Sequence, residues 1–149
     1  MIVQEGCVFS PKYLYGFTIN GIEASSIESF YCALHFDTLT QQKQIAAMVP
    51  EDARLLTLNF GTKQPMWWRK YSPWGGAFLV EIEDLTGGLE ELIKTAYRSQ
   101  VRNSALKRDF LILAFEPFEK VQLDSLLSDE LILMGLEEGR KEAHRDEYV

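Results

Sequence analysis

The stretch 21–37 constrains the fold more than any other part of this 149-residue chain. Asn20-Gly21 is a strong turn signal, because both residues tolerate positive φ. Ser25 and Glu28 then have the spacing of a capping box, which predicts a helix over about residues 26–37. Its apolar residues recur at i, i+3, i+4 and i+7: Ile27, Phe30, Tyr31 and Leu34. One face of this helix is therefore expected to pack against a core.

Three chemically active side chains share a second stripe of the same helix. Glu28, Cys32 and His35 follow one another at i, i+4 and i+7, so a carboxylate and an imidazole are expected on one face. Glu28 and His35 are therefore the candidate catalytic residues. A Cys32–His35 nucleophile pair is disfavoured, because its spacing supplies no third group to orient the histidine. Without catalysis, Glu28 would only complete the capping box, and His35 would be a partly exposed residue of the helix surface.

Helical patterns account for most of the remaining chain. A short hairpin or two is expected within residues 1–19, and helical patterns cover residues 40–48, 50–58, 89–107 and 123–136. The apolar run 110–115 fits a buried strand or a helix. The predicted fold class is mainly α with a small β-hairpin element (α+β). One domain is expected over residues 1–136, followed by a charged tail over 137–149. This tail is expected to be a solvated helix end that frays into disorder, with a partner-binding motif as the alternative.

The irregular segment 59–76 is rich in Gly and Pro and contains all three tryptophans: Trp67, Trp68 and Trp74. Arg69 and Lys70 follow the first two directly. An exposed Trp is costly unless it covers something, so this segment fits an aromatic wall with cations for a nucleotide. The structural alternative, which is equally compatible with the sequence, is a loop held in place by its tryptophans.

Composition narrows the classes of function. The net charge is −7, from 15 Lys and Arg against 22 Asp and Glu, which disfavours a broad nucleic-acid surface. No signal peptide or membrane-spanning run is recognisable, and two cysteines are expected to be reduced, so the cytoplasm is the expected compartment. Glycine-rich phosphate loops and the common metal motifs are missing from the sequence, so neither a cofactor nor a metal is expected.

The residues from Phe17 to Phe36 resemble the signature of the NADAR family, the NAD- and ADP-ribose-associated N-glycosidases that include YbiA-like proteins. That signature runs from an apolar strand through an Asp/Asn-Gly turn and a Ser-x-Glu to an aromatic pair and a closing Lys-Phe. Four later segments occur in the family's usual order: Gln41–Ile45, Pro50–Leu58, Trp67–Lys70 and Ala96–Asn103. The resemblance therefore covers about residues 14–112.

The resemblance implies a compact, mainly α fold and hydrolysis of an N-glycosidic bond. The implied substrates are phosphorylated ribosyl-amines or ADP-ribose attached to guanine, and so a small nucleotide or ribosyl-phosphate ligand is expected. Glu28 matches the family's catalytic glutamate, which would act as an acid or base at the anomeric carbon. The implied ligand-binding residues are Tyr31, Trp67, Trp68, Arg69, Lys70 and Asn103.

Two departures from the family pattern keep a second interpretation open. The family's lysine before the closing Phe, a proposed covalent or electrostatic catalyst, is His35 here, and histidine does not easily form a Schiff base. The family's Leu-Leu-x-Thr-Gly-like segment is not recognisable in residues 110–115. The alternative is a catalytically inactive relative that sequesters an ADP-ribose-type nucleotide or acts as a protein-interaction module.

Overall fold

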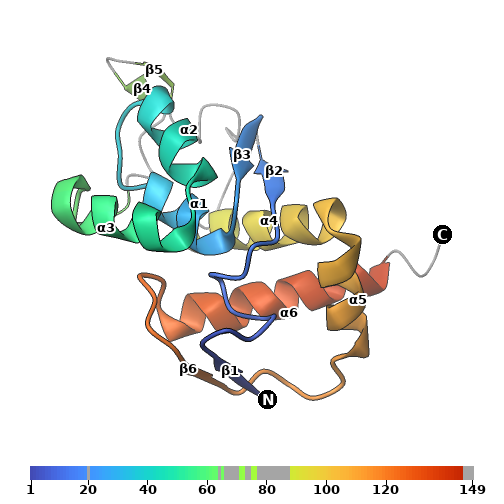
Figure 1. The fold of residues 1–149 in the computed structure, drawn as a ribbon. Coiled ribbons are helices and arrows are strands. Elements are labelled where there is room, and N and C mark those ends of the chain that lie inside the picture. Colours follow the sequence, from blue (N-terminus) through green and yellow to red (C-terminus); the bar gives the residue numbers. More distant parts are fainter. Residues whose placement is uncertain (20, 64, 66–70, 73–74, 77–87, 146–149) are drawn as a thin grey trace.

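Figure 1 shows the computed structural model, which describes residues 1–19, 21–63, 65, 71–72, 75–76 and 88–145. The helices are α1 (Ile27–Ala33), α2 (Leu39–Ala47), α3 (Pro50–Phe60), α4 (Gly88–Asn103), α5 (Ala105–Leu113) and α6 (Asp129–Arg145). The strands are β1 (Ile2–Gln4), β2 (Phe17–Ile19), β3 (Ile22–Ala24), β4 (Tyr71–Ser72), β5 (Gly75–Gly76) and β6 (Lys120–Gln122). The predicted α+β class, mainly helical with a small hairpin, is confirmed.

The strands form separate pairs rather than one sheet. β2 and β3 make an antiparallel hairpin in which Thr18 lies opposite Glu23. Gly21, in the turn between them, has a φ of 75°, a conformation that glycine adopts without steric cost. β1 pairs in parallel with β6, and β4 pairs antiparallel with β5. The β1–β6 pair places the first residues of the chain beside the segment that leads into α6.

Helix α1 lies at the centre of the core and all its residues are buried. Its N-cap is Ser26, whose Oγ accepts a hydrogen bond from the Ser29 N–H at 3.1 Å. The predicted capping box is wrong, because Ser25 instead donates its hydroxyl to the Met48 carbonyl at the end of α2. Glu28 is therefore free to form contacts elsewhere in the fold.

Several helix boundaries differ from those predicted. α1 ends at Ala33, because the next backbone N–H groups bond to carbonyls three residues back, which tightens the chain into a turn. Thr38 then caps α2. α4 ends at Asn103 rather than near residue 107, since Ser104 caps a separate helix, α5. The apolar run 110–115, which fits either a strand or a helix by its sequence, is helical as far as Leu113.

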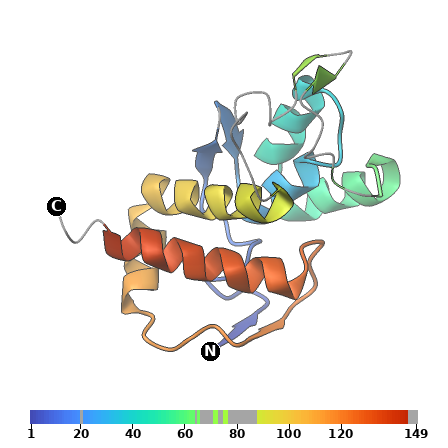
Figure 2. The ribbon, with the colours of Figure 1, turned by 180° about the vertical axis from the view of Figure 1, so that it is seen from behind.

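Helices α4 and α6 lie side by side and run in the same direction, and Figure 2 shows them from the back of the molecule. Gly135 of α6 makes the close approach possible, because a Cβ built there would lie 2.2 Å from Cδ2 of the fully buried Tyr97 ring. α4 also separates α6 from the group that contains α1, α2 and α3 (Figure 1).

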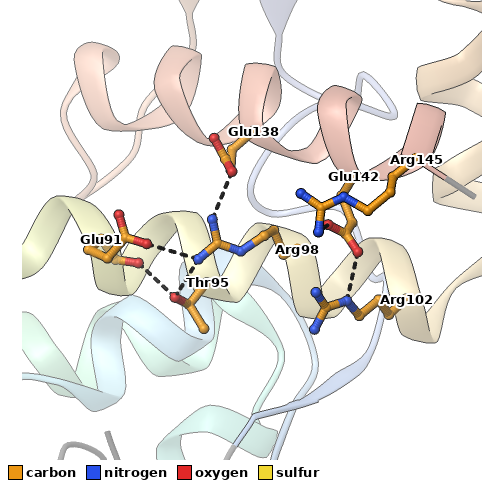
Figure 3. A network of polar contacts seen from close by, with 7 residues as sticks. All are labelled: Glu91, Thr95, Arg98, Arg102, Glu138, Glu142 and Arg145. Atoms are coloured by element: carbon orange, nitrogen blue, oxygen red, sulfur yellow. Dashed lines mark hydrogen bonds and ion pairs between the residues drawn. The ribbon is translucent and has the colours of Figure 1, made fainter. Parts of the chain in front are cut away.

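Charged residues join the same two helices. Arg98 of α4 donates to Glu138 of α6 at 2.7 Å, and Arg102 donates to Glu142 at 2.8 Å (Figure 3). These contacts correct the prediction of a frayed tail that begins at residue 137. Residues 137–145 continue α6, because its charged side chains pair with α4 while its small residues pack against that helix.

Candidate functional site

Glu28 is held by a distant part of the chain. Its side chain is 0% exposed, and its carboxylate accepts hydrogen bonds from the Ser125 hydroxyl at 2.5 Å and the Leu126 N–H at 3.0 Å. Both donors belong to residues 123–128, between β6 and α6, which we call the covering loop. The backbone N–H of Glu28 donates to the Pro11 carbonyl at 2.9 Å. The covering loop thus holds the carboxylate of Glu28, and the N-terminal segment holds its backbone.

Opposing effects act on the protonation of Glu28. Burial raises the pKa of its carboxyl above the ordinary value, because the charged form loses its hydration. The hydrogen bonds from Leu126 and Ser125 lower that pKa, and so do the positive charges of Lys12 and Arg54. The net direction is upward. A carboxyl of this kind retains a proton to higher pH than an exposed one, as a proton donor in catalysis requires.

A chain of ionic contacts links the covering loop to α3 and the N-terminal segment. Arg54 of α3 pairs with Asp124 at 2.8 Å. The Asp124 N–H donates to Glu5 at 3.0 Å, and Glu5 also pairs with Lys12 at 2.7 Å. Sequence reasoning missed Arg54, and its helical pattern over residues 123–136 is wrong for the covering loop, because α6 begins only at Asp129. No local pattern marks them, since their partners are far apart in the chain.

Tyr31, near the end of α1, and His35, in the turn that follows, form an aromatic pair, and the charge of Glu28 acts on Tyr31. Their rings meet edge-on, with centroids 5.0 Å apart and an interplanar angle of 77°. His35 is only 6% exposed, so the interpretation as a partly exposed surface residue is wrong. The reason is that the tight turn after α1 directs its ring back toward the helix, where Nδ1 lies 3.0 Å from the Tyr31 carbonyl oxygen.

The surroundings of His35 define its protonation state. A carbonyl only accepts hydrogen bonds, so Nδ1 must carry the proton. Burial lowers the pKa of the imidazole, and the carbonyls of Tyr31 and Cys32 offset this in part. The ring is therefore neutral near pH 7, with its lone pair on Nε2. That form suits a hydrogen-bond acceptor or a weak base better than a cation that holds phosphate.

Cys32 is excluded as a nucleophile. Its thiol is fully buried, and burial raises its pKa to about 12. The reactive thiolate is therefore scarce at neutral pH. Among the residues that the structure describes, no cluster of three or more His, Cys, Asp or Glu side chains is arranged to hold a metal ion.

The remaining predicted site residues do not join Glu28 in the described part of the chain. Asn103 ends α4 and accepts a hydrogen bond from the Thr18 N–H of β2 at 2.8 Å. It lines a cavity of about 400 Å³ beside the β2–β3 hairpin, which Glu28 and His35 do not line. The predicted ligand-binding residues Trp67, Trp68, Arg69 and Lys70 lie outside the described residues.

No protein-family model, characterised protein or solved structure that we compared with this chain matches it. Within residues 1–145, gaps excepted, no helix has the length and apolar character needed to cross a membrane.

Proposed function

We propose that this protein binds a ribosyl-phosphate or ADP-ribose-type nucleotide next to α1 and hydrolyses its N-glycosidic bond, as a divergent relative of the NADAR family. The observation that supports this most directly is Glu28. It is an ionisable side chain with 0% exposure, on the helix that resembles the family signature, at the position of the catalytic glutamate. Buried carboxyls with raised pKa values are concentrated at functional sites.

The chemistry requires one group that handles protons. When the bond between the anomeric carbon and nitrogen breaks, the departing nitrogen takes up a proton, and the water that adds to the carbon gives one up. Glu28 in its protonated form would donate to the nitrogen, and its carboxylate would then accept the proton from water. The carboxylate would also stabilise the positive charge that develops on the sugar.

Two further features favour an anionic sugar ligand at this place. Arg54 supplies a positive charge close enough to lower the pKa of Glu28, and guanidinium groups bind phosphates through paired hydrogen bonds. The edge-to-face pair of Tyr31 and neutral His35 would offer aromatic rings and the acceptor Nε2 to a ribose or base. Both side chains are buried, so the ligand would reach them only after a local opening. Arg69 and Lys70 remain further candidates for binding the phosphates of the ligand.

A second candidate function has its own supporting observation. Both carboxylate oxygens of Glu28 already accept hydrogen bonds from the covering loop, through Ser125 and Leu126. A carboxylate occupied in this way resembles a structural anchor. If the covering loop never moves, the protein would bind such a nucleotide without cleaving it, and would act as a sequestering relative.

The first test is a ligand panel. The thermal stability of the purified protein is measured with NAD, ADP-ribose, ribose 5-phosphate and ADP-ribosylated guanosine, and each mixture is then analysed for products. A ligand at about a hundred times its Kd should stabilise the protein by about 2.7 kcal/mol. Stabilisation with a cleaved product supports the hydrolase, and stabilisation with the ligand recovered intact supports sequestration. The absence of any shift would contradict both candidates.

A further inference from the structure

The ion pair between Arg54 and Asp124 is asymmetric in its exposure. Arg54 Nη1 lies 2.8 Å from Asp124 Oδ2, while the two side chains are 26% and 75% exposed. The guanidinium is therefore largely enclosed by α3 and its surroundings, and the carboxylate is the solvent-facing partner. A dissolved anion can approach from the side that Asp124 occupies. Pairs with such an exposed partner are weak, so replacement by another anion costs little.

The Arg54 guanidinium also has unused binding capacity. Its Nε is buried without a hydrogen-bond partner among the residues that the structure describes. Guanidinium groups have five N–H donors in a planar fork, and phosphate oxygens match this geometry better than a single carboxylate oxygen does. The hydrogen bond with Asp124 raises the pKa of Arg54, burial lowers it, and the charges of Asp124 and Glu28 raise it further. Arg54 thus stays cationic at the edge of the Glu28 site.

The segment that pairs with Arg54 is also the one that covers Glu28. Asp124, Ser125 and Leu126 are consecutive, and the last two donate the hydrogen bonds that fill both oxygens of Glu28. Figure 1 shows the covering loop rising from β6 toward α3 and α1 before it turns into α6. At its other end Leu127 is only 3% exposed, so the core anchors the loop just beyond the segment that touches Glu28.

We propose that Arg54 binds the phosphate of the ligand, and that Asp124 occupies Arg54 when no ligand is present. Phosphate displaces Asp124, the covering loop loses its ion pair, and Ser125 and Leu126 move away from Glu28. Ligand binding thereby exposes the carboxylate that the proposed hydrolysis requires. This inference rests on the proposed function for the identity of the ligand, but the coupling between Arg54 and the loop has a test of its own.

The test measures amide hydrogen exchange at Leu126 by NMR, with inorganic phosphate as the probe and sodium chloride at equal ionic strength as the reference. Phosphate should accelerate exchange of the Leu126 N–H by about fivefold, because this bond to Glu28 breaks when the loop opens. In Arg54→Gln the acceleration should disappear. Arg145→Gln is the matched control, since it removes an exposed arginine on α6 and should respond as the wild type does.

A second variant tests the role of Asp124. Asp124→Asn removes the competing charge, so exchange at Leu126 should be faster without phosphate, and ribose 5-phosphate should bind up to about fivefold more tightly. Glu137→Gln, which removes the partner of Arg140 on α6, should change neither quantity.

The outcomes separate the two proposals. If phosphate leaves exchange at Leu126 unchanged in the wild type, or if Arg54→Gln responds equally, this inference is overturned even when the ligand panel yields a cleaved product. If phosphate accelerates exchange in the wild type but not in Arg54→Gln, and no nucleotide is cleaved, the coupling between Arg54 and the covering loop is supported and the hydrolase is contradicted.

Discussion

Lys107 offers the sharpest prediction about stability. Its side chain is 1% exposed, its Nζ lies 3.4 Å from the Val8 carbonyl oxygen, and it sits 5.8 and 5.1 Å from the ring centroids of Phe9 and Tyr15. Burial lowers the pKa of its amine from 10.5 to about 7, against a small upward effect of Cys7. Folding therefore forces this lysine toward its neutral form.

The cost follows from that shift. The difference between 10.5 and about 7 corresponds to about 5 kcal/mol at 1.36 kcal/mol per pKa unit. The folded pKa lies below the unfolded one, so between pH 7 and 10.5 the unfolded chain binds more protons. Lys107 thus makes the free energy of unfolding rise with pH across that window. Replacing the amine with an apolar side chain of similar length removes this cost.

Lys107→Met should therefore increase the free energy of unfolding at pH 7, by at most about 5 kcal/mol. Urea denaturation of both proteins at pH 7, 8 and 9 measures this gain. The gain should shrink by about 1.4 kcal/mol per pH unit, since the proton that Lys107 gives up on folding is held less strongly by the unfolded wild type as the pH rises, and the variant has no such proton. A destabilised variant, or a gain independent of pH, would refute the reasoning.

Three further predictions concern packing, capping and reactivity. Gly135→Ala should lower stability by about 2 kcal/mol or more in urea denaturation, because the new Cβ would meet the Tyr97 ring at 2.2 Å; an unchanged midpoint would show that α4 and α6 can separate freely. Ser26→Ala should cost about 1 kcal/mol in the same assay, since it removes the N-cap of α1, and a neutral effect would contradict that cap. In native protein at pH 8, mass spectrometry should find iodoacetamide on the half-buried Cys7 and not on the buried Cys32, whose pKa is raised to about 12; equal labelling would show that α1 opens readily.

Local features of the fold could be predicted because their causes are local. The Asn20-Gly21 pair and the apolar period that follows it predict a turn and then α1. The hairpin was expected within residues 1–19, whereas β2 pairs with β3 across this turn. Pro50 predicts the first residue of α3, because its missing N–H is not needed there. Where two adjacent serines compete for one cap, the pattern selected Ser25 and the fold uses Ser26. A difference of one residue changed the assigned role of Glu28.

The partners of Glu28 could not be predicted from spacing. Ser125 and Leu126 lie 97 and 98 residues away in the chain, and neither belongs to a recognisable motif. The charge-rich end of the chain was misread for the same reason. Its density of Glu, Lys and Arg resembles a solvated tail, but Glu142 is 4% exposed and pairs with Arg102 of α4. The pattern of charges in the sequence does not show whether another helix supplies a partner of opposite charge.

The most direct test of the proposed function compares Glu28→Gln with the wild type for binding and turnover of the nucleotide that stabilises the protein. Glutamine keeps the size of the side chain and an oxygen that can accept from Leu126, and Glu119→Gln serves as the exposed control. The account predicts that Glu28→Gln binds the ligand with affinity close to that of the wild type while product formation falls by at least about a hundredfold. Turnover that survives in a folded Glu28→Gln protein would contradict the assignment of this carboxylate as the catalytic acid and base.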